Sequence, residues 1–285
     1  MNNTGSLGTP KAVFAYDINE RTIKHIASCT AKNIRVAEYK GWCILSAGTT
    51  GVYGVDSSTL SATKYFSPSY ECPILDFGDG MYILSEYSGP YSYAINAATR
   101  TYLGQCGGYM YRAEFGIKLS TGIYLIHSSW GLWAYNPETK STTSLHSVYS
   151  DNSNSNYSCY GLHEMPNGKI LFLGYLKIND VLTRGIFFLE LNPKSFNLIG
   201  PSSEFGITSN EVIKSLGNGE VLMGNAGSKG VIKVTPDGKC SYIIDLIKDW
   251  TTFEENEDVV VISSSSRKEK VSATYNKNTG VVTKN

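Results

Sequence analysis

The chain has 285 residues, of which 41% are hydrophobic, enough to bury one large core or several stacked small ones. Acidic and basic residues number 25 each, so there is no electrostatic reason to expect a nucleic acid or an anionic membrane as a partner. The 20 tyrosines and 28 glycines, together with many Ser, Thr and Asn, are typical of β-sheets and turns rather than of helices.

Export, membrane and metal signals are not visible in the sequence. The first residues, MNNTGSLGTPKAVF, lack a basic region followed by an apolar stretch, and no apolar run reaches the roughly 18 residues of a membrane-spanning helix. The 6 cysteines lie at wide intervals without a C-x-x-C pair, which argues against a zinc site and for buried free thiols. We therefore expect a cytoplasmic or virion-associated protein without a metal or other cofactor.

The first predicted element is a β-hairpin over residues 12–27, with a turn that begins at Asn19. The same turn class, an Asn or Asp followed three residues later by Thr, Ser or Gly, returns at intervals of about forty residues, once of about 56. An Asn or Asp side chain closes such a turn by accepting the backbone N–H two or three residues ahead. Its members, with Thr235 as a departure, begin at Asn19, Asp56, Asn96, Asn136, Asn192, Thr235 and Asn276.

A second turn class alternates with the first along the chain. Each member precedes a short apolar run such as Ile170–Phe172, and a continuous apolar run predicts a strand that is covered on both faces. Asn-Gly and Asp-Gly predict a type I′ turn, which needs a positive φ at both central residues. The pairs are Lys40-Gly41, Asp79-Gly80, Thr121-Gly122, Asn167-Gly168 and Asn218-Gly219, with Glu257-Asp258 in the sixth position.

Two hairpins, and hence four strands, in each stretch of about forty residues predict the blade of an all-β β-propeller. Six complete repeats follow the hairpin at 12–27, and the seven turns of the first class favour seven antiparallel blades with an incomplete first blade. Six blades with a strand-exchanged closure is the alternative count, and a β-solenoid or a pair of sandwiches is the alternative fold. We expect residues 1–285 to form a single propeller domain.

Two segments carry a family resemblance. Tyr135–Thr139 (YNPET) resembles the kelch turn Tyr-Asp-Pro-x-Thr, and Tyr93–Thr99 (YAINAAT) resembles the quinoprotein repeat Ala-Leu-Asp-Ala-x-Thr-Gly. The resemblance extends over nearly the whole chain and implies a propeller of the kelch and quinoprotein superfamily. The kelch Gly-Gly pair is replaced, for example by Ser46-Ala47-Gly48, and the outermost Trp is absent. The resemblance therefore implies the fold and no functional residue.

Aromatic residues are concentrated in the predicted loops of one face. In a propeller, the loops between blades and those between the second and third strands of a blade lie on the same face. A Tyr or Trp in such a loop suits a sugar or a protein surface, although packing between blades is the alternative for each single ring. The candidates are Tyr70, Tyr109, Tyr111, Tyr157 and Tyr160 between blades, Tyr87, Tyr91, Trp130 and Tyr175 within blades, and Arg112, Glu71 and Asn210 as hydrogen-bonding neighbours.

The fourth repeat is the longest, with extra residues at 150–160 and 176–184. Insertions in repeat proteins form loops on one face, often the binding face. These two segments are therefore the first places where we expect partner-specific contacts.

The common catalytic spacings G-x-S-x-G, H-E-x-x-H and G-x-G-x-x-G are missing, and so is a P-loop. Of the 4 histidines, His163 is the one beside a carboxylate, Glu164, on a predicted innermost strand. These two could act with Glu38, Asp76 and Lys214 as the channel-mouth site of a hydrolase or lyase. Because polar residues do not recur at one aligned position, we favour a solvated channel that tolerates them.

The sequence thus predicts a non-catalytic recognition or assembly module that binds a protein or glycan partner through aromatic-rich loops. The neutral composition, rich in Asn, Ser, Thr, Tyr and Gly, suits a phage or other virion component such as a tail or host-recognition protein within a larger assembly. A propeller hydrolase or lyase and a purely structural spacer are the alternatives.

Overall fold

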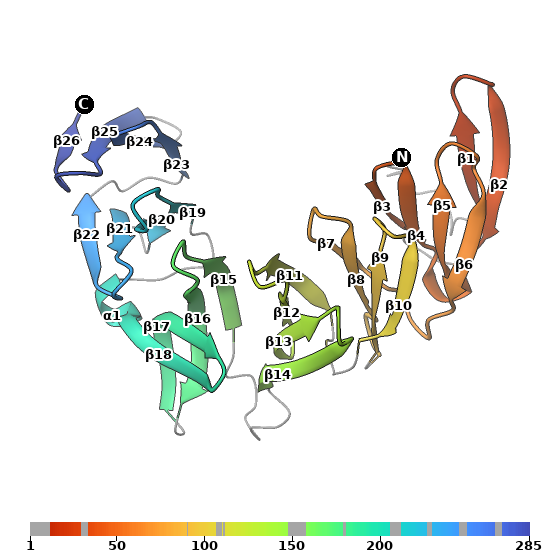
Figure 1. Cartoon of the computed structure of the whole chain (residues 1–285), viewed down its shortest axis with the longest axis horizontal. Coiled ribbons are helices and arrows are strands. Elements are labelled where there is room, and N and C mark those ends of the chain that lie inside the picture. The colour runs from red at the N-terminus through yellow and green to blue at the C-terminus, as the bar shows by residue number, and fades with distance from the viewer. Residues whose placement is uncertain are drawn as a thin grey trace. The chain divides into compact units, whose positions relative to one another are not determined.

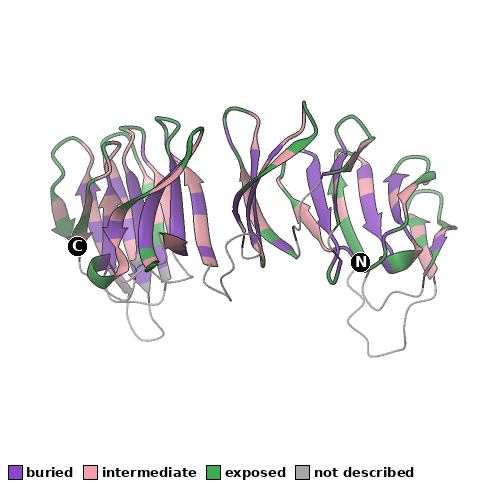
Figure 2. Ribbon diagram, turned by 90° about the horizontal axis from the view of Figure 1, so that it is seen from below, coloured by how far each residue is buried: buried purple, intermediate pink, exposed green. Residues whose placement is uncertain are grey.

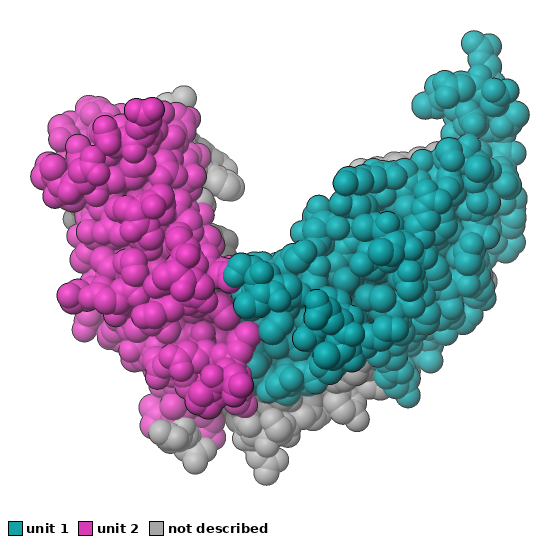
Figure 3. Space-filling view, in the orientation of Figure 1, with its two compact units in different colours: residues 1–149 teal, residues 150–285 magenta. Residues whose placement is uncertain are grey.

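The computed structural model describes residues 12–29, 34–89, 91–106, 110, 112–147, 158–178, 181–205, 212–226, 230–244, 250–265 and 270–285. Their contacts divide the chain into two compact units, residues 1–149 and 150–285 (Figure 3). The single domain expected over residues 1–285 stays a prediction. Within the described part of the chain, no helix has the length and apolarity needed to cross a membrane.

The described residues of the first unit form one hairpin and three four-stranded antiparallel sheets, whose strands pair in sequence order (Figure 1). The 3-10 helix η1 (Gly48–Thr50) lies between the second and third strands of the first of these sheets. The hairpin is β1 (Ala12–Asp17) with β2 (Thr22–Ser28), and the sheets are β3 (Arg35–Tyr39), β4 (Trp42–Ser46), β5 (Val52–Asp56) and β6 (Ala62–Phe66); β7 (Ile74–Asp76), β8 (Met81–Ser85), β9 (Ser92–Asn96) and β10 (Thr101–Gln105); and β11 (Ala113–Lys118), β12 (Tyr124–Ser128), β13 (Gly131–Asn136) and β14 (Ser141–Ser147).

In its described residues, the second unit contains three further four-stranded antiparallel sheets with the same strand order, and one short helix, α1 (Ser202–Phe205). The sheets are β15 (Ser158–Glu164), β16 (Ile170–Ile178), β17 (Val181–Leu191) and β18 (Lys194–Pro201); β19 (Val212–Ser215), β20 (Val221–Ala226), β21 (Gly230–Val234) and β22 (Cys240–Ile244); and β23 (Trp250–Glu255), β24 (Val259–Ser265), β25 (Lys270–Asn276) and β26 (Val282–Lys284).

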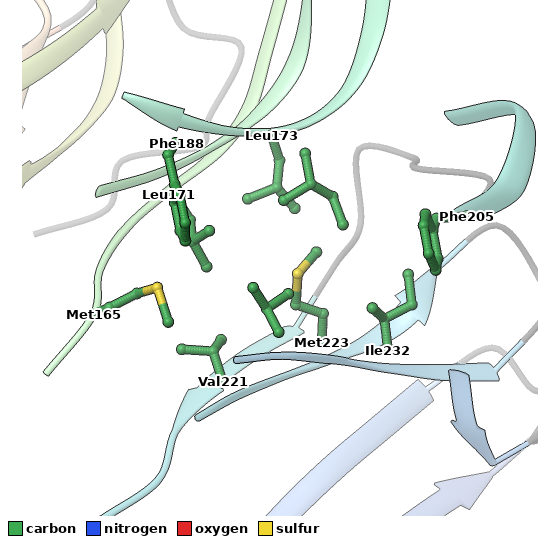
Figure 4. Packing of buried hydrophobic residues seen from close by; sticks show 10 residues of the cluster. Met165, Leu171, Leu173, Phe188, Phe205, Val221, Met223 and Ile232 are labelled. Carbon is green, nitrogen blue, oxygen red and sulfur yellow. The ribbon is translucent and has the colours of Figure 1, made fainter. Parts of the chain in front are cut away.

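Successive sheets within a unit pack face to face through the side chains of their middle strands, which are the most buried parts of the chain in Figure 2. In the first unit, Ile44 of β4 lies in one apolar cluster with Leu84 and Ile95 of the next sheet. In the second unit, Leu173 of β16 lies in one cluster with Met223 of β20 (Figure 4). The expectation that the apolar runs form strands covered on both faces is confirmed.

Consecutive four-stranded meanders that stack on their faces are the blades of a β-propeller. The described residues form six such sheets preceded by one hairpin. The predicted all-β propeller fold is therefore confirmed, and so is the order of six complete repeats after a partial first one.

The first turn class closes as its chemistry predicts at Asp56, Asn96, Asn136 and Asn276. At Asn192 the prediction is wrong, because Leu191 pairs with Lys194 across a two-residue loop. The Asp56 Oδ1 atom accepts the backbone N–H groups of Ser58 and Thr59, at 2.9 and 3.2 Å. At the first turn, however, the acceptor is Asp17 and not Asn19, because the Asp17 Oδ1 atom takes the Asn19 N–H at 2.8 Å. The prediction for Asn19 is wrong by two residues, since Asp17 ends β1 as Asp56 ends β5.

The second turn class has the predicted glycines but not the predicted turn type. The five glycines have φ between 79° and 90°, whereas among the residues just before them Lys40 alone has a positive φ, of 47°. In the turn before β16, the Gly168 N–H donates to the Met165 carbonyl at 2.8 Å. This is a type I turn followed by one left-handed glycine, the usual three-residue hairpin loop, so the type I′ prediction is wrong for all but Lys40-Gly41.

Of the extra residues 176–184 of the fourth repeat, the described ones, 176–178 and 181–184, do not form a loop. They lengthen the β16–β17 hairpin, in which Leu176 pairs with Thr183 and Ile178 with Val181. Residues 158–160 belong to β15, and residues 150–157 lie outside the described residues. The loop prediction for 176–184 is wrong because the added residues continue the strand ladder.

Replacing Gly168 with Val is expected to lower the free energy of unfolding by about 1 kcal/mol or more, because a β-branched residue resists the φ of +79° found there. A Cβ atom at this position meets nothing within 4 Å, so the cost comes from the backbone and not from crowding. Gly168→Asn is the matched control, since Asn tolerates a left-handed conformation. Chemical denaturation measures both variants, and equal stability of Gly168→Val and the wild type would contradict the turn assignment.

Candidate functional site

Three of the predicted tyrosines come together at one end of the β7–β10 sheet. Tyr87 and Tyr91 lie between β8 and β9, and Tyr70 lies in the segment that leads from β6 to β7. Their side chains are 45% (Tyr70), 48% (Tyr87) and 43% (Tyr91) exposed. We call these three residues the tyrosine platform.

A fully buried glutamate, Glu86, fixes the two segments that carry the platform. Its Oε1 atom accepts the Ser69 N–H at 2.8 Å and the Tyr93 hydroxyl at 3.2 Å. Glycine is required at position 89, because a Cβ atom there would lie 1.8 Å from the Glu86 Oε2 atom. The backbone adds a direct link, since the Tyr87 N–H donates to the Glu71 carbonyl at 2.8 Å. The platform is therefore held by buried groups rather than by solvent-exposed contacts.

Two buried serines fix the next segment, which carries Arg112. The Ser85 Oγ atom accepts the Ala113 N–H at 2.7 Å, and the Ser92 hydroxyl donates to the Met110 carbonyl at 3.4 Å. The Arg112 guanidinium then lies 5.4 Å from the centre of the Tyr87 ring. Attraction between the cation and the ring's π-electrons favours this arrangement. The structure thus places the predicted Arg112 beside the predicted Tyr87.

A cavity of about 630 Å³ lies next to the platform, within the range of small-molecule sites. The first strands β3, β7 and β11 of three successive sheets lie side by side, and the lining comes from the beginnings of these strands and from the β8–β9 loop. The lining residues are Arg35, Glu71, Cys72, Pro73, Tyr87, Arg112, Ala113 and Glu114. The lining is therefore mixed in charge, with two arginines and two glutamates.

The glutamate on β11 is an oriented, negatively charged acceptor. The Ser129 hydroxyl donates to the Glu114 Oε1 atom at 3.2 Å, and the Arg112 Nε atom lies 3.9 Å away. His127 is also close, with its Nε2 atom 3.6 Å from the Glu114 Oε2 atom. Burial lowers the pKa of His127 to about 4 despite the opposing effect of Glu114. His127 is thus neutral at pH 7 and does not act as a cation beside Glu114.

Two other lining residues, Cys72 and Arg35, differ in what they can offer a ligand. Burial, reinforced by the charge of Glu86, raises the pKa of the Cys72 thiol far above its usual value, so Cys72 is not an activated nucleophile. Arg35 is exposed at the beginning of β3, and among the described residues no carboxylate lies within ion-pair distance of it. The cavity therefore offers an unpaired cation but no reactive thiolate.

Two of the predicted tyrosines of the second unit, Tyr160 and Tyr175, lie on strands and not in loops. Tyr160 belongs to β15 and Tyr175 to β16, with ring centroids 6.1 Å apart in an edge-on contact. The Arg184 guanidinium lies 5.2 Å from the Tyr160 ring centre. The loop prediction fails here because strand pairing in the long hairpin continues past Tyr175, which pairs with Arg184.

Of the remaining aromatic candidates, Trp130 lies in the predicted loop between β12 and β13 and is partly buried. Tyr109, Tyr111, Tyr157 and the neighbouring candidate Asn210 lie outside the described residues. The binding roles of all these residues stay predictions.

The alternative catalytic residue His163 lies on β15, the first strand of its sheet, as predicted. Its Nε2 atom lies 2.5 Å from the Ser215 Oγ atom, and burial lowers its pKa, with Glu164 opposing. Lys214 is engaged by Glu255 at 3.2 Å. No three His, Cys, Asp or Glu side chains among the described residues converge as ligands for one metal ion.

The two other members of that predicted constellation belong to the first unit and stabilise turns. The Glu38 Oε1 atom accepts the Gly41 N–H at 2.6 Å, and the Asp76 Oδ1 atom accepts the Gly78 N–H at 2.7 Å. Both carboxylates thus have a structural function at the ends of β3 and β7.

Sequence reasoning did not identify Arg35, Glu114 or the buried Glu86 as parts of this site. Glu86 had one available signal, since it follows the apolar run Met81–Leu84 and precedes a Gly-Pro turn at 89–90. A charged residue directly after a buried strand is often held by the loops that meet there.

No family model matches the chain, and no curated protein matches it. Among solved structures, the computationally designed Ika8 protein is similar with a TM-score of 0.52 at 11% identity, over 96% of this chain and 80% of that chain. Virginiamycin B lyase from Staphylococcus aureus has a TM-score of 0.45 at 9% identity, over 90% of this chain and 85% of the lyase. The extracellular domain of the BT3049 hybrid two-component system from B. thetaiotaomicron has a TM-score of 0.42 at 11% identity, over 96% of this chain and 37% of that chain. At these identities the similarity to Ika8 concerns the fold alone, and the chain is a β-propeller by fold.

Proposed function

We propose that the chain is a non-catalytic recognition module that binds a protein or glycan partner at the tyrosine platform and its cavity. The observation that carries the proposal is the set of three half-exposed tyrosines fixed by the fully buried Glu86 beside a cavity of about 630 Å³. Loops that are already fixed lose little conformational entropy on binding, so the contact area of the tyrosines they carry contributes efficiently to affinity.

The hydrolase or lyase alternative has one observation in its favour. The His163 Nε2 atom lies within hydrogen-bond reach of the Ser215 hydroxyl, as a base must lie beside its nucleophile. That pair belongs to the second unit, whereas the platform and the cavity belong to the first. Recognition at the platform does not require it.

The larger assembly, the location and the type of propeller are proposed from the composition and the turn sequences alone. A virion or phage-tail component in a larger assembly, and a cytoplasmic or virion-associated location, follow from the composition. A propeller of the kelch or quinoprotein type is proposed from the turn sequences at 93–99 and 135–139. The platform would serve any of these settings in the same way.

Replacing Tyr87 with Ala is expected to weaken partner binding by about tenfold or more, because it removes a ring of the platform together with its contact to Arg112. Glycan and peptide arrays probed with the full chain measure this effect. The free energy of unfolding should change by no more than about 0.5 kcal/mol, since the ring is 48% exposed.

Tyr16→Ala is the matched control for this experiment. Tyr16 lies on β1, is 49% exposed and does not line the cavity. The variant therefore removes a ring of equal exposure at a distance from the proposed site. Array binding should be unchanged in this variant. Unchanged binding in Tyr87→Ala as well would exclude the platform as the recognition surface.

A further inference from the structure

The cavity beside the platform carries charges of a particular kind. Arg35 has no carboxylate partner among the described residues, and Arg112 has its nearest carboxylate contact with Glu114 at 3.9 Å, longer than a good charge-assisted hydrogen bond. A guanidinium presents a planar fork of donors that matches a carboxylate. Both arginines are therefore available to an anionic group of a ligand.

The carboxyl groups in the lining limit how many negative charges the anionic group of the ligand can carry. Glu114 and Glu71 contribute two carboxyl groups, and the adjacent His127 is neutral at pH 7 and brings no compensating positive charge. Two carboxylates would repel a phosphate or a sulfated polyanion, which bring several negative charges. They would accept hydrogen bonds from hydroxyl groups, because an ionised carboxylate is an acceptor only. The ligand that fits has one carboxylate and several hydroxyls.

The tyrosines beside the cavity favour ring-shaped groups in a ligand. Tyr87 lines the cavity, and Tyr70 and Tyr91 lie on the loops that are fixed to it by Glu86. Flat, half-exposed aromatic faces pack against apolar faces of similar width, and the C–H face of a pyranose ring is one of these. A ligand longer than the cavity would thus continue over the tyrosines.

We propose that the cavity binds a carboxylate-bearing sugar, a uronic or sialic acid, as one residue of a glycan that extends over the tyrosine platform. In this arrangement Arg35 and Arg112 bind the carboxylate, and Glu71 and Glu114 accept hydrogen bonds from the sugar hydroxyls. The inference rests on the proposed recognition function and names its ligand class.

Titration calorimetry of the full chain with matched saccharides tests the inference. One arm compares a uronic-acid trisaccharide with its carboxyl-reduced neutral counterpart, and the other compares sialyllactose with lactose. We expect that in at least one of the two pairs the acidic saccharide binds about tenfold or more tightly than its neutral counterpart. We expect Arg112→Asn and Arg35→Gln each to abolish that preference, and higher salt to weaken it. Asn suits the φ of +52° at position 112, so the backbone is preserved.

Arg184→Gln is the matched control. Arg184 lies over Tyr160 at 5.2 Å, as Arg112 lies over Tyr87 at 5.4 Å, but it does not line the cavity. Its affinities for all four saccharides should equal those of the wild type.

The possible outcomes separate the two proposals. Equal binding of acidic and neutral saccharides would overturn the carboxylate assignment and leave recognition at the platform supported. Binding of a peptide with a free terminal carboxylate, in place of every saccharide, would overturn the sugar assignment alone. If no probe binds and Tyr87→Ala has no effect on the arrays, both proposals are wrong.

Discussion

Replacing Leu173 with Ala is expected to lower the free energy of unfolding by about 3 kcal/mol. Leu173 has no exposed surface and lies on β16 in one apolar cluster with Met223 and Ile232 of the next sheet (Figure 4). Truncation leaves a cavity between two sheets whose backbones are fixed by their own ladders, so the site cannot collapse. Chemical denaturation measures the loss.

Leu182→Ala is the control, because it makes the same change in the same sheet. Leu182 lies on β17 and is 55% exposed, so its truncation should change stability by no more than about 0.5 kcal/mol. Similar losses in the two variants would show that face-to-face packing of the sheets is not what stabilises the second unit.

The repeat pattern and the blade architecture could be predicted from the sequence because both depend on local chemistry. An Asp or Asn turn is closed by atoms two or three residues apart, as at Asp56, and a left-handed glycine such as Gly168 serves its own turn. Errors arose where two local solutions compete. Asp17 and Asn19 can both accept the N–H groups of the first turn, although only Asn19 has a Thr three residues later, and strand pairing competes with a loop at 176–184.

The members of the candidate site could be predicted in part. Antiparallel strands alternate in direction, so the strand order determines which loops lie at the same end of a sheet. The nearness of Tyr70 to Tyr87 follows from that order. The anchoring contacts do not follow, because they join residues far apart in sequence, as Ser85 and Ala113 do. The strand register also shifts between Ala113 and Phe115 at the start of β11. No local sequence pattern predicts this shift.

Two equivalent tyrosines show how the neighbouring sheet decides the role of a residue. Tyr82 and Tyr124 each lie two residues after the glycine of a second-class turn, and burial raises the pKa of each to about 12. The Tyr124 hydroxyl donates to the Asp79 Oδ2 atom at 2.6 Å. The preceding sheet has Lys40 where the next has Asp79, and among the described residues the Tyr82 hydroxyl has no hydrogen-bond partner. The sequence repeat therefore predicts where such a tyrosine lies in its sheet, but not which residue its hydroxyl group binds.

Gly116→Ala is expected to lower the free energy of unfolding by about 3 kcal/mol through overpacking. A Cβ atom at Gly116 would lie 2.4 Å from the Leu125 carbonyl oxygen and 2.7 Å from the Phe77 ring. The carbonyl is fixed in the β11–β12 ladder, and Phe77 packs edge-on against Tyr124 with centroids 4.8 Å apart. Neither neighbour can move without disturbing the packing of the β7–β10 sheet on the β11–β14 sheet.

Gly161→Ala is the matched substitution, on the first strand of the next sheet in the chain, and its effect should have the opposite sign. A Cβ atom at Gly161 would have its nearest neighbour, Ile213 Cδ1, at 3.6 Å, which is ordinary van der Waals contact. Because Ala restricts the unfolded chain, this variant should be more stable than the wild type by about 0.4 to 1 kcal/mol. Chemical denaturation of the two variants side by side decides the matter, and a stabilising Gly116→Ala would contradict the close approach of the sheets at Gly116.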